Sequence, residues 1–539
     1  MSGSITLENR FGVNKMELIS LKYAIFVIVL LVLYYCFPKK YRWYVLLAGS
    51  MAYYVIICKW YVLFIIFTIC TTYGSTIWID KLLKEQNAIV KSHKEDWDRQ
   101  TRKEYKEKGR KKRVAVMLFA LLCNFGILAF LKYIPYAGEL GLLLPLGISF
   151  YTFQSMGYVM DVYREIVEPE KNFLKVALFV SFFPQIIQGP IAIYDKLAGQ
   201  LYEGHSLRLE NLQKGALLVL WGVMKKLVIA DRAVNIINFV MDKPMDFSGT
   251  YVFFAAVVYA LQLYADFSGG IDIVRGIAEM FGITMSTNFN HPYFSRSLTE
   301  YWHRWHMTLG DWCRNYIFYP LSISKRFLNF GKWLKPRFGA HISKVLPGCI
   351  ASVITFIVIG VWHGANMKYL YFGLWNGIVI MLAELFAPVN KKVAGGFFKL
   401  TGLREKGIFA TIVSVLWTFM LILVGYYFDI AANASTAFHM LFKSVTDFHI
   451  CELGINNIIL NLGACGLDQY DILLLIICTL LWLFISFVEE NKKLDMRDFI
   501  LSRKLPLRWA IIYLGIFIVI IFGYYGPGVN PADFVYMQF

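Results

Sequence analysis

The chain has 539 residues, of which 58% are hydrophobic, and its formal net charge is +17. Soluble proteins contain roughly 45–50% apolar residues, so this composition excludes an ordinary soluble domain. Apolar runs long enough to cross a hydrocarbon layer of ~30 Å recur along the whole chain. Because backbone groups in lipid must be paired within the chain, these runs predict helices. The expected fold class is therefore all-α, as a polytopic integral membrane protein.

The apolar runs predict about eleven to thirteen membrane helices, some of them too short to cross alone and therefore re-entrant. The candidate spans lie near residues 22–37, 43–58, 60–79, 114–134, 141–160, 173–188, 212–235, 250–266, 347–362, 368–387, 407–427, 470–488 and 509–527. The first run has no small-residue cleavage site after it, so we expect a retained span behind a polar head and no secretory signal. No internal repeat or linker is visible, so residues 1–539 are expected to form one membrane domain.

The distribution of charge argues against nucleic acid as a partner. Basic residues gather in short loops, and Lys/Arg-rich loops of membrane proteins face the cytoplasm. We therefore place residues 80–113, a charged loop expected to be helical, on the cytoplasmic side. The same rule places the basic segment 321–346 inside and the acidic segment 428–469 outside. The expected partners thus include membrane lipids and no nucleic acid.

His363 is the first catalytic candidate, because it stands alone between two apolar runs. A lone histidine in a soluble core would usually be a structural residue bonded to a nearby carbonyl. Ionisable groups within membranes are functional more often than not, and an imidazole titrates near neutrality, which suits proton removal from a hydroxyl. Gly364 and Ala365 beside it are expected to leave room for a substrate.

A second group of polar and aromatic residues runs from Ser297 to Leu321. His303 and His306 are spaced as one helical turn, but no third ligand stands at a useful distance, so we expect no metal. His306 is a candidate for polarising a carbonyl. Asp311 and Arg314 are spaced to pair on one helix face. Three further residues have two interpretations, substrate binding or anchoring at the membrane interface: Trp302, Arg304 and Trp305.

Two further features favour a structural interpretation. Asp266 lies in a predicted span and needs a partner if buried, and Arg275 is the candidate, in a polar knot that holds helices together. Most of the nine cysteines lie in apolar runs and behave as small hydrophobic residues. A bridge between Cys451 and Cys465, which share a predicted outer loop, is conceivable from the sequence but has no further support.

At these residues the chain resembles the membrane-bound O-acyltransferase (MBOAT) family. The resemblance is to the bacterial branch that modifies alginate by O-acetylation and teichoic acid by D-alanylation. The matching stretches are LPLGISFYTFQSMGYVMDVYR (144–164), SFFPQIIQGPI (181–191), YADFSGGIDIVRGIAEMFG (264–282), NFNHPYFSRSLTEYWHRWHMTLGDWCRNYIFYPL (288–321), WHGANMKYLYFGLWNG (362–377) and FVYMQF (534–539). One departure concerns the acceptor: Pro320 is followed by LSISK, where the alginate type has a PLGG-like turn.

The resemblance implies an O-acyltransferase, and more specifically an O-acetyltransferase, in which a central tunnel crosses a bacterial plasma membrane. His363 matches the family's catalytic histidine, and His306 matches the histidine of its RWH motif. The residues expected to line the tunnel or bind substrate are Trp302, Arg304, Trp305, Asp311, Arg314, Trp362 and Asn366. The family implies no permanently bound cofactor. The acyl donor is then acetyl-CoA or an acyl carrier protein.

Three functions remain open from the sequence. The first is acetyl transfer to hydroxyls of an exported or cell-envelope polysaccharide, with or without an extracytoplasmic partner protein. The second is D-alanyl transfer from a carrier protein to teichoic acid. The third, from another class, is a transporter or flippase without chemistry, which would predict two related halves with paired broken helices.

Overall fold

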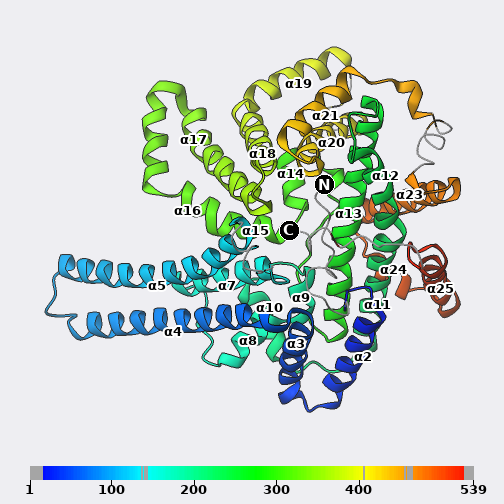
Figure 1. The fold of residues 1–539 in the computed structure, drawn as a ribbon. Helices are drawn as coiled ribbons and strands as arrows, with labels where there is room; N and C mark the ends of the chain where they lie inside the picture. The colour runs from blue at the N-terminus through cyan, green and yellow to red at the C-terminus, as the bar shows by residue number, and fades with distance from the viewer. Residues whose placement is uncertain are drawn as a thin grey trace. The chain divides into compact units, whose positions relative to one another are not determined.

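The computed structural model of the chain is helical and divides into two compact units (Figure 1). It describes residues 16–134, 138, 142, 144–402, 404, 407–454, 457, 465–526 and 534. The first unit comprises residues up to 219 together with 271–286, and the second comprises 220–270 together with 287–539. The predicted polar head before Met16 and most of the FVYMQF motif lie outside the described residues.

The first unit is built from helices that follow one another with short connections. They are α2 (Leu21–Cys36), α3 (Arg42–Cys58), α4 (Val62–Ser92), α5 (Arg99–Tyr133), α7 (Ile148–Tyr163), α8 (Phe173–Ser181), α9 (Phe183–Gln188) and α10 (Tyr194–Tyr202), with the short turns η1 (Lys39–Tyr41) and η2 (Lys59–Tyr61). Two helices, α11 (Leu209–Met224) and α13 (Gly249–Met280), contribute residues to both units. Helix α7 is buried along almost all of its length, so it forms the centre of this unit.

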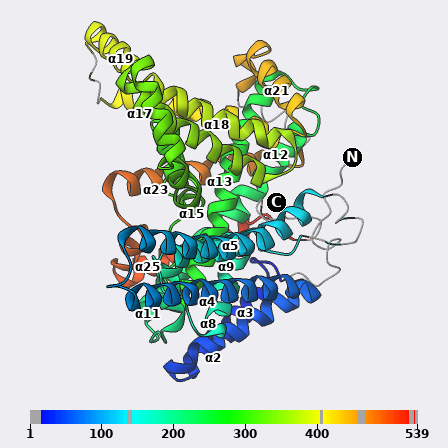
Figure 2. The same cartoon turned by 90° about the vertical axis from the view of Figure 1, so that its left-hand side faces the viewer.

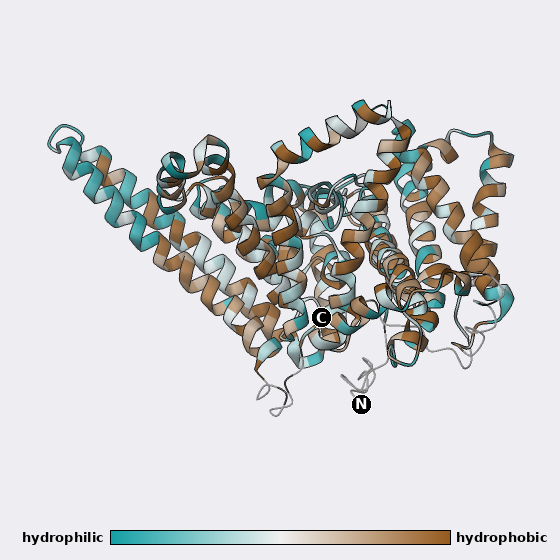
Figure 3. Ribbon diagram, turned by 90° about the horizontal axis from the view of Figure 1, so that it is seen from above, coloured by the Kyte–Doolittle hydropathy of each residue, from teal (hydrophilic) through white to brown (hydrophobic). Residues whose placement is uncertain are grey.

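Helices α4 and α5 form a long hairpin whose outer part is polar (Figures 1, 2 and 3). The apolar part of α5 begins at Val114, and the residues before it are mostly charged. The side chain of Asp98 accepts hydrogen bonds from the N–H groups of Gln100 and Thr101, which caps the start of α5. The charged segment 80–113 is therefore helical over most of its length, as the sequence predicts.

The second unit contains the remaining helices. They are η3 (Lys225–Ala230, a π-helical turn), α12 (Asp231–Met241), η4 (Pro292–Phe294), α14 (Leu298–Arg304), α15 (Met307–Cys313), η5 (Arg314–Phe318), α16 (Tyr319–Ser322), α17 (Lys325–His363), α18 (Met367–Leu385), α19 (Ala387–Thr401), α20 (Ile408–Ile430), α21 (Ala434–Thr446), η6 (Ile450–Leu453), α23 (Gln469–Lys492), α24 (Met496–Leu501) and α25 (Leu505–Phe522). Helix α17 turns back on itself at Gly339, whose φ of 81° is unfavourable for residues with a side chain.

The close packing of α17 and α18 fixes the position of His363, the last residue of α17. These two helices lie side by side in Figures 1 and 2. A Cβ atom at Gly360 would collide with the carbonyl oxygen of Tyr369, and one at Gly373 would collide with that of Phe356. Glycine at both positions lets the backbones approach, as small residues do between membrane helices.

Each predicted span overlaps a helix among the described residues, although 144–147, in the span near 141–160, precede α7 and are not helical. The all-α, multi-pass fold is confirmed. Seven helical stretches among the described residues are long and apolar enough to cross a membrane, or up to eight if α18 and α19 form one bent span. The candidate spans near 22–37 and 173–188 correspond to shorter apolar helices, and the second of them breaks at Phe182. The single integral domain expected from the sequence stays a prediction.

A buried ion-pair cluster ties η3 and α12 to α13 in the second unit. The Nζ atom of Lys226 lies 2.7 Å from Asp266 and 2.8 Å from Asp231, and all three side chains are at most 3% exposed. The ring of Phe534 packs over the same ammonium group, 4.5 Å away. The predicted partner of Asp266 was wrong: Arg275 pairs with Asp272 at 3.7 Å, one helical turn away. The structural interpretation of Asp266 is consistent with this cluster.

The nine cysteines are free thiols in this structure. The conceivable bridge between Cys451 and Cys465 is therefore absent.

We expect Lys226→Met to destabilise the protein, because it leaves two buried carboxylates without their shared cation. Breaking a buried pair costs about 3–5 kcal/mol, whereas an exposed bridge contributes about 0–1 kcal/mol. Thermal unfolding of the purified protein in detergent measures the effect. The control is Lys214→Met in α11, which removes a bridge to Glu210, a residue 66% exposed. Equal melting temperatures for the two variants would contradict a stabilising role for the cluster.

Candidate active site

A small buried cavity in the second unit brings the two candidate histidines together. His306 and His363 both line it, with Trp302 and Trp305 from the predicted set. The other lining residues are Leu263, Tyr301, Leu309, Phe372, Tyr426 and Asp429. The cavity has a volume of about 30 Å³, which is enough for one or two water molecules and too small for a thioester with its acceptor.

The backbone breaks at His306, which changes the interpretation of the two neighbouring histidines. Helix α14 ends at Arg304, and His306 adopts a left-handed conformation with φ 44° and ψ 52° before α15 begins. Such angles are uncommon for a residue with a side chain, and they concentrate at functional sites. His306 is 1% exposed, whereas His303 is exposed. The two imidazoles therefore do not share the face of one continuous helix, as their spacing would suggest.

Asn288 holds this break in place. Its side-chain oxygen accepts hydrogen bonds from the N–H of Thr308 at 3.1 Å and from the Thr308 hydroxyl at 2.9 Å. Its backbone oxygen accepts a bond from the N–H of Met307 at 2.9 Å. The same side-chain oxygen lies 3.2 Å from Nδ1 of His306. The start of α15 and the imidazole are thus both bound to a single buried residue, which the sequence analysis did not single out as a site residue.

These contacts determine the tautomer of His306. A backbone N–H can only donate, so the Asn288 atom that faces Thr308 is the oxygen and not the amide nitrogen. Because that oxygen accepts, Nδ1 of His306 must carry the hydrogen. In the neutral ring, Nε2 then has the lone pair and acts as an acceptor or a base.

Burial keeps His306 neutral. Desolvation by burial, with a smaller contribution from charge on His363, lowers the pKa of His306 to about 3. The edge of the ring meets Phe267, with the centroids 4.9 Å apart, so its surroundings are apolar on that side. The histidine cavity therefore favours an uncharged His306.

His363 lies at the turn between α17 and α18, where its ring is partly buried between aromatic residues. Its centroid is 4.9 Å from that of Trp362, 6.0 Å from Tyr369 and 5.6 Å from Phe372. The sequence led us to expect that Gly364 leaves room for a substrate. In the structure the ring of Tyr369 fills that space, and a Cβ atom at Gly364 would collide with it. The glycine instead allows this ring to pack against the turn that carries His363.

A chain of tyrosine hydroxyls runs along one side of the cavity. The hydroxyl of Tyr426 lies 2.7 Å from that of Tyr301 and 3.1 Å from that of Tyr293. Tyr293 in turn donates to the carbonyl oxygen of Ala260 at 2.6 Å. Because each hydroxyl is engaged, this wall is polar and rigid.

Asp429 is a lining residue that the sequence analysis assigned wrongly to an outer loop. It lies in α20 and contributes the carboxyl group of the cavity. Its Oδ2 atom accepts a hydrogen bond from Tyr259 at 2.7 Å. The ammonium group of Lys368 bonds to the carbonyl oxygens of Asp429 and Ala431 at 2.7 and 2.8 Å. The predicted span ended at residue 427, so Asp429 was counted with the acidic segment that follows. In the structure α20 continues to Ile430 and includes Asp429.

Five predicted site residues do not line this cavity. Arg304 is bound by Glu300 at 2.7 Å and Glu490 at 3.0 Å. Asp311 and Arg314 pair with each other, as their spacing predicts. Trp362 is buried beside His363, and Asn366 caps α18 by accepting a bond from the N–H of Lys368 at 3.1 Å. Among the described residues, no group of three His, Cys, Asp or Glu side chains could hold a metal ion.

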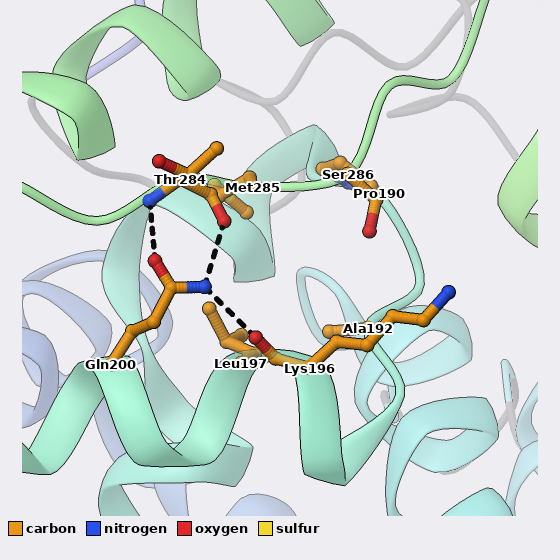
Figure 4. A pocket seen from close by; sticks show the side chains of 8 residues that line it. All are labelled: Pro190, Ala192, Lys196, Leu197, Gln200, Thr284, Met285 and Ser286. Carbon is orange, nitrogen blue, oxygen red and sulfur yellow. Dashed lines mark hydrogen bonds between the residues drawn. The ribbon is translucent and has the colours of Figure 1, made fainter.

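A larger cavity of about 230 Å³ in the first unit lacks these features (Figure 4). The side-chain amide of Gln200 spans it, accepting a hydrogen bond from Thr284 N–H at 2.8 Å and donating to the Thr284 carbonyl at 3.2 Å. Lys196 provides the one charged side chain among its lining residues. It contains no nucleophile paired with a base, so the histidine cavity is the better candidate for an active site.

Several bacterial proteins are similar to this chain. A probable alginate O-acetylase of Pseudomonas syringae pv. tomato is 30% identical over 315 residues, which cover 58% of this chain and 54% of that protein. A peptidoglycan O-acetyltransferase of Helicobacter pylori is 30% identical over 51% of this chain and 56% of that protein. A teichoic acid D-alanyltransferase of Bacillus subtilis is 26% identical over 52% and 67%. The chain thus spans little more than half the length of the first two relatives.

The family comparison agrees with the motifs. Residues 169–335 match the model of the MBOAT, membrane-bound O-acyltransferase, family. This range includes Asn288 and His306, whereas His363 lies beyond its end. The resemblance predicted from the sequence is confirmed: residues 169–335 are similar to the membrane-bound O-acyltransferase family.

Proposed function

We propose that this protein is a multi-pass O-acyltransferase of a bacterial plasma membrane. In this proposal it moves an acetyl group from a cytoplasmic thioester to hydroxyls of an exported or cell-envelope polysaccharide, directly or through an extracytoplasmic partner protein. The observation that carries the proposal is the cavity that His306 and His363 share. Two relatives named for O-acetyl transfer support the acetyl group, and their names give the polymers alginate and peptidoglycan.

His363 is the general base in this mechanism. Its imidazole removes the proton of the acceptor hydroxyl while the hydroxyl oxygen attacks the thioester carbonyl carbon. The carbon–sulfur bond then breaks, the thiolate leaves, and the proton on His363 passes to the sulfur. The products are an ester and a free thiol, so no further reactant is needed.

His306 acts on the hydroxyl in this mechanism and not on the carbonyl. Because its Nδ1 hydrogen is directed to Asn288, the neutral ring offers Nε2 as an acceptor. A neutral acceptor orients a hydroxyl, but it cannot donate to the oxygen of the tetrahedral intermediate. The proposal therefore revises the carbonyl-polarising role that the sequence suggests for His306.

Substrates reach the histidines only after the lining side chains move. A volume of about 30 Å³ does not hold an acetyl thioester beside a sugar hydroxyl. Enzymes often keep water away from a reactive ester by closing the site until the acceptor is bound. The central tunnel implied by the family stays a prediction, as do the donor and any carrier protein.

We expect His363→Ala to abolish most transfer while the protein still folds. General base catalysis contributes about 10²–10⁴-fold, so the initial rate should fall by at least ~100-fold. The assay follows labelled acetyl-CoA into polysaccharide, with the purified protein in lipid nanodiscs. The matched control is His303→Ala, an exposed histidine in the neighbouring helix α14, which should retain the wild-type rate. Wild-type activity of the His363 variant would exclude the proposed base.

We expect Asn288→Ala to lower the transfer rate and Asn288→Asp to restore much of it. A carboxylate accepts the same three hydrogen bonds, so it keeps the tautomer, and its charge raises the pKa of His306. Protonation of His306 should therefore remove activity at a higher pH in the Asp variant than in the wild-type protein. Asn290→Ala, an exposed neighbour, serves as the control. Loss of activity in both Asn288 variants, with no change in the pH dependence of the rate, would instead indicate a packing role.

The donor test compares labelled acetyl-CoA with D-alanyl-loaded carrier protein, using the same nanodiscs. We expect the acetyl group to appear on envelope polysaccharide and the D-alanyl group not to be transferred. Mass spectrometry of the polysaccharide identifies the product. D-alanyl transfer would replace the acetyl proposal with the activity named for the Bacillus subtilis relative. Binding of the labelled donor with no covalently modified polysaccharide would favour a transporter.

A further inference from the structure

A groove of about 490 Å³ lies on the hairpin of α4 and α5 in the first unit. Six of its lining side chains are Lys or Arg, and two are Glu. Both carboxylates already have partners: Glu107 lies 2.7 Å from Arg110, and Glu165 lies 3.7 Å from Arg113. The groove therefore has a net positive charge that its own acidic residues do not neutralise.

Arg113 gives the groove a buried cationic floor. Its side chain is 9% exposed. Neither its Nε nor its Nη1 atom has a hydrogen-bond partner among the described residues. The contact with Glu165 is too long for a hydrogen bond, although it contributes electrostatic attraction. A buried guanidinium with unused donors is costly, so the site is built for an acceptor with several oxygen atoms.

Helices α4 and α5 lie close together beside the groove. The amide end of Gln86 of α4 occupies the place that a Cβ atom at Gly109 of α5 would take. Gln86 is itself 7% exposed and, like Arg113, lines the groove. Because α5 becomes apolar at Val114, this buried end lies where the helix leaves its charged part.

We propose that the groove binds a phosphate group, with Arg113 at its floor and Lys106 and Arg110 at its walls. The planar guanidinium matches the spacing of two phosphate oxygens, and lysine adds charge without fixed geometry. The phosphate belongs either to the headgroup of an anionic phospholipid or to a soluble phosphate-bearing molecule. A recessed guanidinium is reached by a single phosphate more readily than by a flat acidic protein surface. This site requires neither His306 nor His363, so it extends beyond the proposed transfer reaction.

The experiment uses the full-length protein in nanodiscs of phosphatidylcholine, with and without phosphatidylglycerol. Calorimetry measures the binding of inorganic pyrophosphate and of CoA in the absence of anionic lipid. Thermal unfolding measures the stabilisation that phosphatidylglycerol confers. The test variants are Lys106→Gln and Arg113→Gln. The control is Lys108→Gln, which removes the same charge from the same helix at an exposed residue that does not line the groove.

We expect Arg113→Gln to weaken binding by about tenfold or more, as the loss of a hydrogen bond to a charged group does. Lys106→Gln should weaken it about threefold to tenfold, and because Lys106 is exposed this variant folds whether or not the Arg113 variant does. Lys108→Gln should leave binding unchanged. If the Lys106 and Arg113 variants bind pyrophosphate or CoA more weakly, the ligand is a soluble phosphate. If they lose only the stabilisation by phosphatidylglycerol, the ligand is a lipid headgroup.

Three results would overturn the phosphate site. Equal losses in Lys106→Gln and Lys108→Gln would show a diffuse surface charge without a specific groove. No response to pyrophosphate, CoA or phosphatidylglycerol in the wild-type protein would show that phosphate is not recognised. Binding of an acidic carrier protein that pyrophosphate cannot displace would assign the groove to a protein partner instead.

Discussion

The single side-chain oxygen of Asn288 is the point on which the candidate site depends. It bonds both to Thr308, at the start of α15, and to Nδ1 of His306, so it holds a strained backbone and a tautomer at once. These bonds are buried, and the left-handed conformation of His306 is held by them. The same contacts decide which nitrogen of the imidazole carries the hydrogen, so a backbone constraint has a chemical consequence.

The same requirement for pairing explains the other polar groups of the second unit. Lys226 lies between Asp231 and Asp266, and Tyr426 lies between Tyr301 and Tyr293. Each cluster joins segments that are far apart in the chain, and in each the interaction partners are themselves buried. Polar residues in a membrane interior thus serve as specific cross-links, because an incorrect pairing would leave several groups unsatisfied together.

The sequence predicted the apolar helices well because a long apolar run is a strong signal, and every predicted span overlaps a helix within the described residues. It predicted the site less well. The spacing of His303 and His306 suggested one helix, because no pattern in the residues announces a left-handed histidine. Asp266 was given a partner nearby in the chain, but its actual partner is Lys226, 40 residues away. The sequence did contain a signal for this pairing. Lys225 and Lys226 lie within an apolar run, where a lysine is as exceptional as an aspartate.

The two histidines are alike in chemistry but differ in environment, and this difference separates their roles. His306 is sealed at a helix break with one nitrogen committed to Asn288, whereas His363 lies at an interhelical turn that glycines bring close to α18. Burial lowers the pKa of His306, so this ring acts as a neutral acceptor, and proton removal is assigned to His363 in the proposed mechanism. In the proposed mechanism, one proton passes from the acceptor hydroxyl to His363 and then to the leaving thiolate. A single base is therefore sufficient for acyl transfer from a thioester to a hydroxyl.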